Sequence, residues 1–172
     1  MCLCVSCKGV DLPLTFHSVH GKNVELSADR RQVKRVRSFD FGICFSARPI
    51  AIGEKVFLKF VDTDTSVLYM GYSGALRFGF TSTDPGSLRG EDLPRYACPD
   101  MTVKPGNWAK SLEERYTAAG NELFFYVNRA GDVLYGVNGK DKGLFLSYVN
   151  TSGPLWTLLD IYGNTVCVEF SK

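Results

Sequence analysis

The sequence predicts an all-β protein, an antiparallel β-sandwich of about a dozen short strands. Apolar and polar residues alternate with a period of two in several stretches, as at Val56, Leu58 and Phe60 between Lys55, Phe57 and Lys59. Seventeen glycines separate the apolar runs, which suits many tight turns. The twelve Phe and eight Tyr residues also favour strands.

The chain of 172 residues fits one domain, and its 45% apolar and 22% charged residues exclude bulk disorder. We expect residues 1–12 to be a tail outside the fold, disordered or added to the natural sequence, and residues 13–172 to be the domain. Cys2, Cys4 and Cys7 in the tail lack a fourth ligand, so a zinc site is disfavoured. Residues 1–12 lack the features of a signal peptide, which predicts a cytoplasmic protein with cysteine thiols.

Strands are expected in order along the chain, each as an alternating or apolar run bounded by turn residues. A long loop rich in proline and glycine is expected over 84–107, and one or two helical turns over 113–119. Hairpin turns are expected at 128–131, 138–143 and 162–164. The predicted strands are 14–19, 24–27, 30–37, 38–46, 54–61, the centre of 69–85, 108–112, 122–128, 132–138, 143–148, 155–162 and 165–170.

The strand within 69–85 organises the prediction. Leu76, Phe78 and Phe80 share one face, whereas Arg77 and Thr81 point to the other. An arginine in the middle of an apolar strand indicates that the second face of this sheet has a polar role.

The stretch 30–37 carries five positive charges, on Arg30, Arg31, Lys34, Arg35 and Arg37. Because charge falls on both faces, we expect an edge strand or an exposed ribbon. The stretch is either a solvated edge that resists aggregation or a phospholipid-binding surface, at roughly 1 kcal/mol per basic residue near a membrane. Nucleic acid is disfavoured, because no recognition motif accompanies the charges.

Catalysis is not indicated. His17 and His20 have no carboxylate or cysteine companion and are expected at the surface. Acidic pairs such as Asp62 with Asp64 lie in loops without the aromatic setting of a glycosidase, and no calcium-loop spacing is present. We therefore expect no catalytic residue, no metal and no cofactor.

Five segments resemble, in order, the neuralized homology repeat (NHR) domain of the Neuralized ubiquitin ligases of the Notch pathway. They are 37–49, 73–85 (Ser-Gly-Ala-Leu-Arg-Phe-Gly-Phe-Thr-Ser-Thr-Asp-Pro), 93–100, 108–110 and 155–164 (Leu-Trp-Thr-Leu-Leu-Asp-Ile-Tyr-Gly-Asn). The resemblance implies a SPRY/concanavalin-like sandwich that binds proteins. Where the family usually has Trp before the central strand, this chain has Tyr72 after an extra 68–71 segment, so the contact made there differs.

The resemblance also implies partners. Such domains recognise Asn-x-x-Asn motifs in the intracellular tails of Delta and Serrate-type Notch ligands and in Bearded-type inhibitors, and basic residues of the family bind phosphoinositides. It implies a place in the cytoplasm, peripheral at the plasma membrane or endosomes. A separate RING domain recruits the conjugating enzyme, and the six cysteines and two histidines here cannot supply its eight ligands.

An asparagine-rich peptide needs fixed polar groups, because an unpaired buried amide costs about 1–3 kcal/mol. Polar side chains on the central strand and its exit loop, and aromatic rings with polar tips, are the candidates. Each aromatic ring could instead serve packing, and Asp84 could instead form a turn before proline. The predicted peptide-binding residues are Tyr72, Arg77, Thr81, Ser82, Asp84, Tyr96, Tyr126, Trp156, Asp160 and Tyr162.

Overall fold

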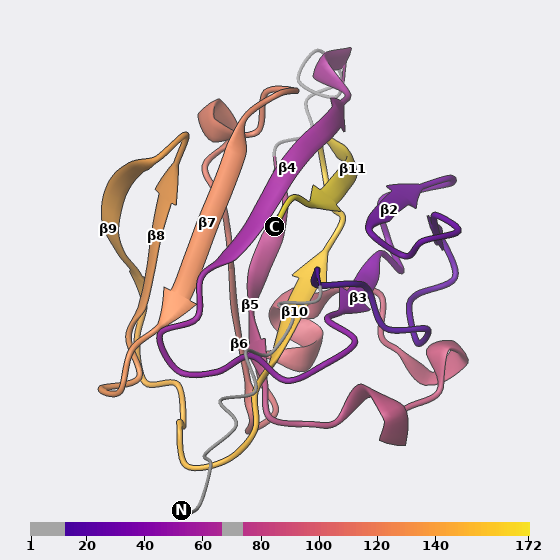
Figure 1. Cartoon of the computed structure of the whole chain (residues 1–172). Coiled ribbons are helices and arrows are strands. Elements are labelled where there is room, and N and C mark those ends of the chain that lie inside the picture. Colours follow the sequence, from indigo (N-terminus) through magenta and orange to yellow (C-terminus); the bar gives the residue numbers. More distant parts are fainter. Residues whose placement is uncertain (1–12, 67–73) are drawn as a thin grey trace, which may run out of the picture.

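The computed structural model describes residues 13–66 and 74–172 and contains two antiparallel sheets packed face to face (Figure 1). One sheet has seven strands in the order β1-β2-β11-β4-β7-β8-β9, and the other has four in the order β3-β10-β5-β6. The predicted antiparallel sandwich is confirmed, with eleven strands in the described residues. Neither described range contains a helix long and apolar enough to cross a membrane.

The strands are short, as the turn residues predict. They are β1 (Val24–Leu26), β2 (Gln32–Arg35), β3 (Ile43–Phe45), β4 (Val56–Thr63), β5 (Arg77–Thr81), β6 (Asn107–Ser111), β7 (Glu122–Val127), β8 (Val133–Val137), β9 (Lys140–Leu146), β10 (Trp156–Asp160) and β11 (Thr165–Phe170). Single helical turns are η2 (Pro85–Ser87), η3 (Gly90–Asp92), η4 (Ala97–Met101) and η5 (Glu114–Tyr116).

The main core lies between the two sheets and is rich in phenylalanine. Alternation along each strand sends one set of side chains inward, so Leu58 and Phe60 of β4 meet Phe78 and Phe80 of β5 in one buried cluster with Phe125 of β7. Phe78 lies with its ring centroid 4.6 Å from that of Phe125. The predicted inward faces of β4 and β5 are therefore confirmed.

A second, smaller core lies on the outer face of the four-stranded sheet. Ile43 and Phe45 of β3 and Leu158 of β10 point away from the main core. The 84–107 segment, coloured pink in Figure 1, covers them with Leu93 and Met101. The second face of this sheet is therefore enclosed by a loop, and the polar residues of β5 and β10 lie under or beside that loop.

Two predicted strands are wrong. Residues 14–19 form only an isolated bridge, between Phe16 and Ser46, although Phe16 is fully buried. The stretch 38–46 is a strand only at Ile43–Phe45, because Phe41 adopts a φ of 52° that no extended strand tolerates.

The turn between β8 and β9 is also tighter than predicted. Asn138 and Gly139 have φ values of 52° and 76°, the two positive values of a two-residue hairpin turn. Lys140 then pairs with Val137 and begins β9, so the segment 140–143 expected in the loop lies in the strand, with two shifts of register.

The expectation that the basic stretch forms an edge strand is wrong. β2 pairs with β1 on one side and with β11 on the other, so the edge is the three-residue strand β1. Val33 lies between Arg31 and Arg35 on the same face of the chain, and it is fully buried. Charges at the two ends of so short a strand can reach the sheet rim while the residue between them fills the core.

Candidate peptide-binding site

Four of the predicted residues meet at one end of the four-stranded sheet, namely Arg77, Asp160, Tyr96 and Tyr162. Arg77 of β5 and Asp160 of β10 are direct cross-strand partners. Tyr96 precedes η4, and Tyr162 follows β10. Because the loop and two neighbouring strands converge here, residues distant in the sequence form one cluster.

Asp160 is the buried anchor of this cluster, with no exposed surface. Its Oδ2 accepts a hydrogen bond of 2.9 Å from the Ala97 N–H and lies 3.7 Å from Arg77 Nη1. Its Oδ1 is buried and has no hydrogen-bond partner among the described residues. Burial raises the pKa of Asp160 to about 6, although the Ala97 N–H and Arg77 both favour the carboxylate.

Arg77 is held between polar and aromatic partners. Its Nη1 donates a 3.0 Å hydrogen bond to the Cys98 carbonyl, and its guanidinium lies 3.7 Å from the ring centroid of Tyr162 and 5.6 Å from that of Tyr96. Stacking of this kind stabilises an arginine without consuming all of its donors. With 17% of the side chain exposed, Arg77 presents an edge of a rigid planar cation at the surface.

The prediction missed four residues in and around this cluster, Phe39, Phe41, Lys22 and Arg95. Phe39 contacts Tyr162 edge to face, with ring centroids 5.3 Å apart. Lys22 lies over the Phe41 ring at 4.2 Å, and Arg95 lies 5.8 Å from the same ring. The period-two pattern had assigned Phe39 and Phe41 to a buried strand face. The backbone instead turns at Phe41, where φ is 52°, and both rings lie beside the site. Alternation of apolar residues does not reveal such a turn. We call Arg77, Asp160, Tyr96, Tyr162 and Phe39 the aromatic–arginine cluster.

Four further predicted residues belong to the opposite end of the same two strands. Thr81 lies directly across from Trp156, about 13 Å along the strand from Arg77. Thr81 is buried and donates to Asn107 Oδ1 at 2.8 Å. Ser82 bonds the Gly106 carbonyl at 3.3 Å, and Asp84 caps η2 by accepting from the Gly86 N–H at 2.8 Å. The hydrogen bonds of these three polar residues are thus made within the fold.

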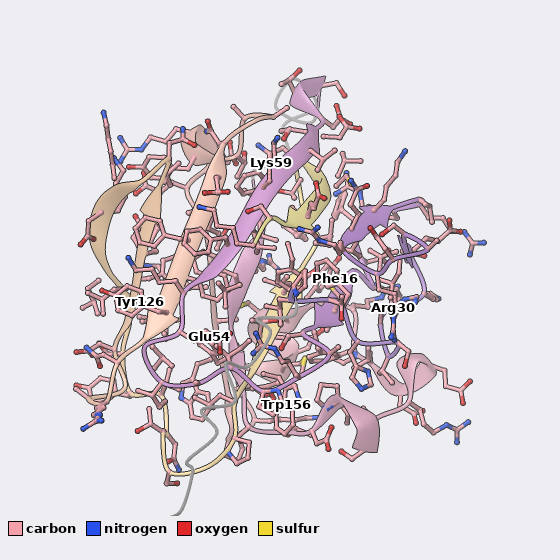
Figure 2. All side chains as sticks on the ribbon, viewed as in Figure 1. Phe16, Arg30, Glu54, Lys59, Tyr126 and Trp156 are labelled. Atoms are coloured by element: carbon pink, nitrogen blue, oxygen red, sulfur yellow. The ribbon has the colours of Figure 1, made fainter. Side chains whose placement is uncertain are left out.

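The two remaining predicted aromatic residues do not join the cluster. Tyr126 lies on the outer face of the seven-stranded sheet, with Lys55 Nζ 5.7 Å from its ring, and Figure 2 places it well away from Trp156. Tyr72 lies outside the described residues, as do the cysteines of residues 1–12.

The basic stretch divides into two sets. Arg35 donates from Nη1 to the carbonyls of Gly163 and Thr165 at 2.7 and 2.9 Å, and Arg31 donates from Nη2 to that of Phe170 at 2.9 Å. Burial lowers the pKa of Arg35. Arg30, Lys34 and Arg37 are exposed, and the side chain of Arg30 is labelled in Figure 2.

Two antiparallel sheets, with a loop over the outer face of the smaller one, define a SPRY-like sandwich. The PSpry domain of TRIM65 has this fold, with a TM-score of 0.59 at 14% identity over 94% of this chain and 93% of that one. The family model described as Neuralized matches residues 16–172. The chain therefore belongs to the Neuralized family and is an NHR domain.

Individual relatives agree with this assignment. The crystal structure of the Drosophila melanogaster neuralized-NHR1 domain superposes with a TM-score of 0.88 at 48% identity, over 94% of this chain and 99% of that one. Protein neuralized of Drosophila melanogaster is 49% identical over 92% of this chain, which spans 20% of that protein. The human E3 ubiquitin-protein ligase NEURL1B is 43% identical over 87% of this chain, which spans 26% of it. The chain thus corresponds to one part of much longer relatives.

Proposed function

We propose that this NHR domain is the substrate-recognition module of a Neuralized-type ubiquitin ligase. It binds Asn-x-x-Asn-type peptides in the intracellular tails of Delta and Serrate-type Notch ligands, or in Bearded-type inhibitors. The observation that carries the proposal is the aromatic–arginine cluster, in which a fixed guanidinium lies between two half-buried tyrosines.

The chemistry of this cluster suits a side-chain amide. A guanidinium N–H of Arg77 donates to the amide oxygen, and the flat ring of Tyr96 or Tyr162 packs on the amide plane. Asp160 and the Cys98 carbonyl fix the guanidinium before the peptide arrives, so little side-chain entropy is lost on binding. A peptide that lacks the amide leaves these groups without their partner.

We infer that ubiquitin transfer itself takes place outside this chain. The names of several relatives state that they are E3 ubiquitin-protein ligases, and the chain matches only their NHR portion. We infer that a RING domain elsewhere in the full protein recruits the conjugating enzyme, and that the domain acts in the cytoplasm, at the plasma membrane or endosomes where Notch-ligand tails lie.

Calorimetric titration with a Delta-tail peptide tests the recognition role. The native peptide should bind, and the same peptide with both asparagines changed to alanine should lose at least tenfold in affinity. Tyr96→Ala in the domain should weaken binding of the native peptide by a similar factor, because it removes one wall of the site. Tyr126→Ala is the matched control, since it removes a half-buried tyrosine from the other sheet. Equal binding of both peptides would refute the proposal.

A second candidate function is phosphoinositide binding through the basic stretch. The exposure of Arg30, Lys34 and Arg37 favours it, at roughly 1 kcal/mol each near an anionic membrane. Arg35 contributes less, because its guanidinium donates to two backbone carbonyls, whereas Arg31 donates to one and stays partly exposed. Charge reversal at the three exposed positions should abolish sedimentation with phosphoinositide vesicles, and sedimentation that resists both this change and high salt would exclude the role.

A further inference from the structure

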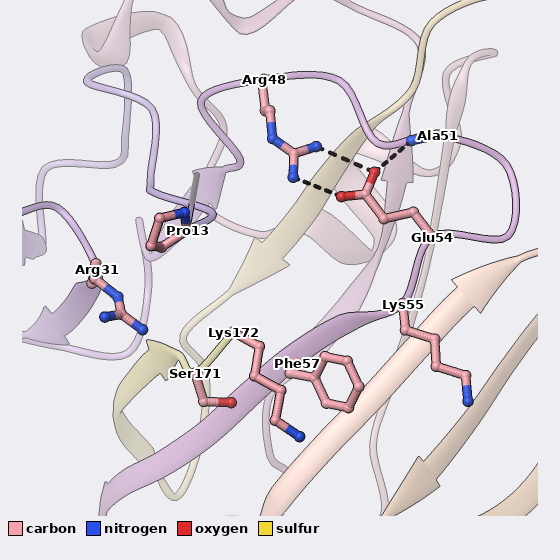
Figure 3. A pocket seen from close by; sticks show the side chains of 9 residues that line it. All are labelled: Pro13, Arg31, Arg48, Ala51, Glu54, Lys55, Phe57, Ser171 and Lys172. Atoms are coloured by element: carbon pink, nitrogen blue, oxygen red, sulfur yellow. Dashed lines mark hydrogen bonds and ion pairs between the residues drawn. The ribbon is translucent and has the colours of Figure 1, made fainter. Parts of the chain in front are cut away.

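A separate hollow opens beside β4 and shares no residue with the aromatic–arginine cluster. It encloses about 830 Å³ and lies between the loop that precedes β4 and the residues that follow β11 (Figure 3). A smaller hollow of about 440 Å³ shares Pro13, Arg31 and Arg48 with it. We call the larger hollow the basic groove; it is lined by Pro13, Arg31, Arg48, Ala51, Glu54, Lys55, Phe57, Ser171 and Lys172.

The charges in this lining are unbalanced. The lining contains four basic side chains, those of Arg31, Arg48, Lys55 and Lys172, and one acidic side chain, that of Glu54. Glu54 is occupied within its own loop, where its Oε1 lies 2.6 Å from Arg48 Nη2 and its Oε2 accepts a 2.8 Å hydrogen bond from the Ala51 N–H (Figure 3). Burial would raise the pKa of Glu54, but these hydrogen bonds lower it. The Arg48–Glu54 pair, joined by two hydrogen bonds, forms one wall of the groove.

Two of the cations are available to a ligand. Among residues 13–66 and 74–172, neither Arg31 nor Lys55 forms an ion pair. Arg31 Nη2 donates to the Phe170 carbonyl and its Nε is buried, so Nη1, which forms no hydrogen bond or ion pair with the described residues, is the donor left for a ligand. Lys55 Nζ rests 4.9 Å from the Phe124 ring, a contact that leaves an ammonium largely solvated. Lys172 Nζ is shared between Glu122, at 3.5 Å, and the Phe57 ring, at 4.2 Å.

The shape and floor of the groove select among anionic partners. Phe57 is half buried and forms an apolar floor, with the cations around it. A recessed aromatic floor with charged walls suits an extended chain whose side chains alternate between carboxylate and apolar groups.

We propose that the basic groove binds a short acidic peptide segment of a partner protein. One carboxylate of this segment pairs with Arg31, whose planar donors match it, and a second pairs with Lys55. An apolar side chain between them packs beside Phe57, whose ring also contacts Lys172 Nζ. This surface is a second docking site, distinct from the asparagine-reading cluster, and either site can be lost without the other.

Fluorescence anisotropy with a designed probe tests this proposal. The probe is a fluorescein-labelled twelve-residue peptide with the repeat Glu-Ala-Tyr-Glu, and its control has glutamine in place of every glutamate. The glutamate peptide should bind wild-type domain at least tenfold more tightly, with affinity that falls between 50 and 300 mM salt because the pairing is electrostatic. Lys55→Glu should weaken binding by about tenfold, equivalent to about 1.4 kcal/mol.

Lys59→Glu provides the matched control. Lys59 is exposed, as Lys55 is, and lies four residues after it on the outer face of β4. It does not line the groove, and Figure 2 shows it well away from Glu54. The two variants change net charge equally, so binding should change less than twofold in Lys59→Glu.

Three results would overturn the proposal. One is equal binding of the glutamate and glutamine peptides, and another is an equal loss in the two lysine variants, which would indicate attraction by net charge alone. The third is vesicle binding that depends on Lys55 more strongly than peptide binding does, which would assign the groove to membranes. Amide shift mapping with the glutamate peptide should move resonances in 48–57 and leave those of Tyr96 and Tyr162 in place.

Discussion

Replacing Asp160 with asparagine should remove a pH-dependent penalty on the stability of this domain. Asp160 is fully buried against Arg77, and burial raises its pKa from the ordinary 3.8 to about 6. Between these values the unfolded chain releases the proton more readily than the native one. The contribution of Asp160 to stability is therefore complete below about pH 4 and is lost as pH rises through 6.

The size of this effect follows from the displacement of the pKa. A difference between 3.8 and about 6, at about 1.36 kcal/mol per unit, corresponds to about 3 kcal/mol of unfolding free energy. The amide of asparagine does not ionise, and its oxygen can still accept from the Ala97 N–H. The charge of Asp160 opposite Arg77 exists only where the carboxyl is ionised, and its attraction to Arg77 is already included in the pKa of about 6.

Urea denaturation of both proteins at several pH values between 4 and 7.5 measures the effect. The unfolding free energy of Asp160→Asn minus that of wild type should rise by about 3 kcal/mol across this range. Arg77→Met in the wild-type background should move the titration to higher pH, because the guanidinium favours the carboxylate. A difference that stays flat, or that falls with pH, would show that Arg77 and the Ala97 N–H outweigh burial and would refute the reasoning.

Two further predictions concern packing and hydrogen bonding. Gly79→Ala should destabilise the domain by about 1–3 kcal/mol, because the new Cβ would collide with the Trp108 carbonyl on the paired strand β6. Calorimetric melting should show a drop of several degrees, with Gly153→Ala unchanged because nothing lies within 4 Å of that site; equal melting temperatures would contradict the collision. Arg35→Met should cost about 2–3 kcal/mol in urea unfolding, since it strips the carbonyls of Gly163 and Thr165 of a charged donor. Arg37→Met, at an exposed position, should cost less than about 0.5 kcal/mol, and similar losses in both would refute the distinction.

The sandwich could be predicted from the sequence because alternation reports directly on which face of a strand is buried. Leu58 and Phe60, like Phe78 and Phe80, point to the core as period two predicts, since β4 and β5 are each paired on both sides. The prediction failed at Phe41, where one residue of positive φ ends the alternation, and at β9, where two register shifts follow the turn.

The site was less accessible to sequence reasoning. Parity correctly grouped Arg77 with Thr81 and Trp156 with Asp160, since each pair shares a strand face. Parity does not tell which end of a strand face is covered by a loop. Here the segment 84–107 places Tyr96 beside Arg77 at one end, and at the other end Thr81 is buried and donates to Asn107. The hydrogen-bond partners of Arg31 and Arg35 could not be predicted either, because a charge pattern does not reveal which backbone carbonyls need a donor.

The route of the chain through the small sheet also determines when the aromatic–arginine cluster exists. β10 lies between β3 and β5 in the sheet and brings Asp160 next to Arg77. In the sequence, however, β10 is the next to last of the described strands. A chain still emerging from the ribosome carries Phe39, Arg77 and Tyr96 long before it carries Asp160 and Tyr162. The aromatic–arginine cluster is therefore complete only once nearly the whole domain has been synthesised, and fragments that stop before β10 contain an incomplete set of its residues.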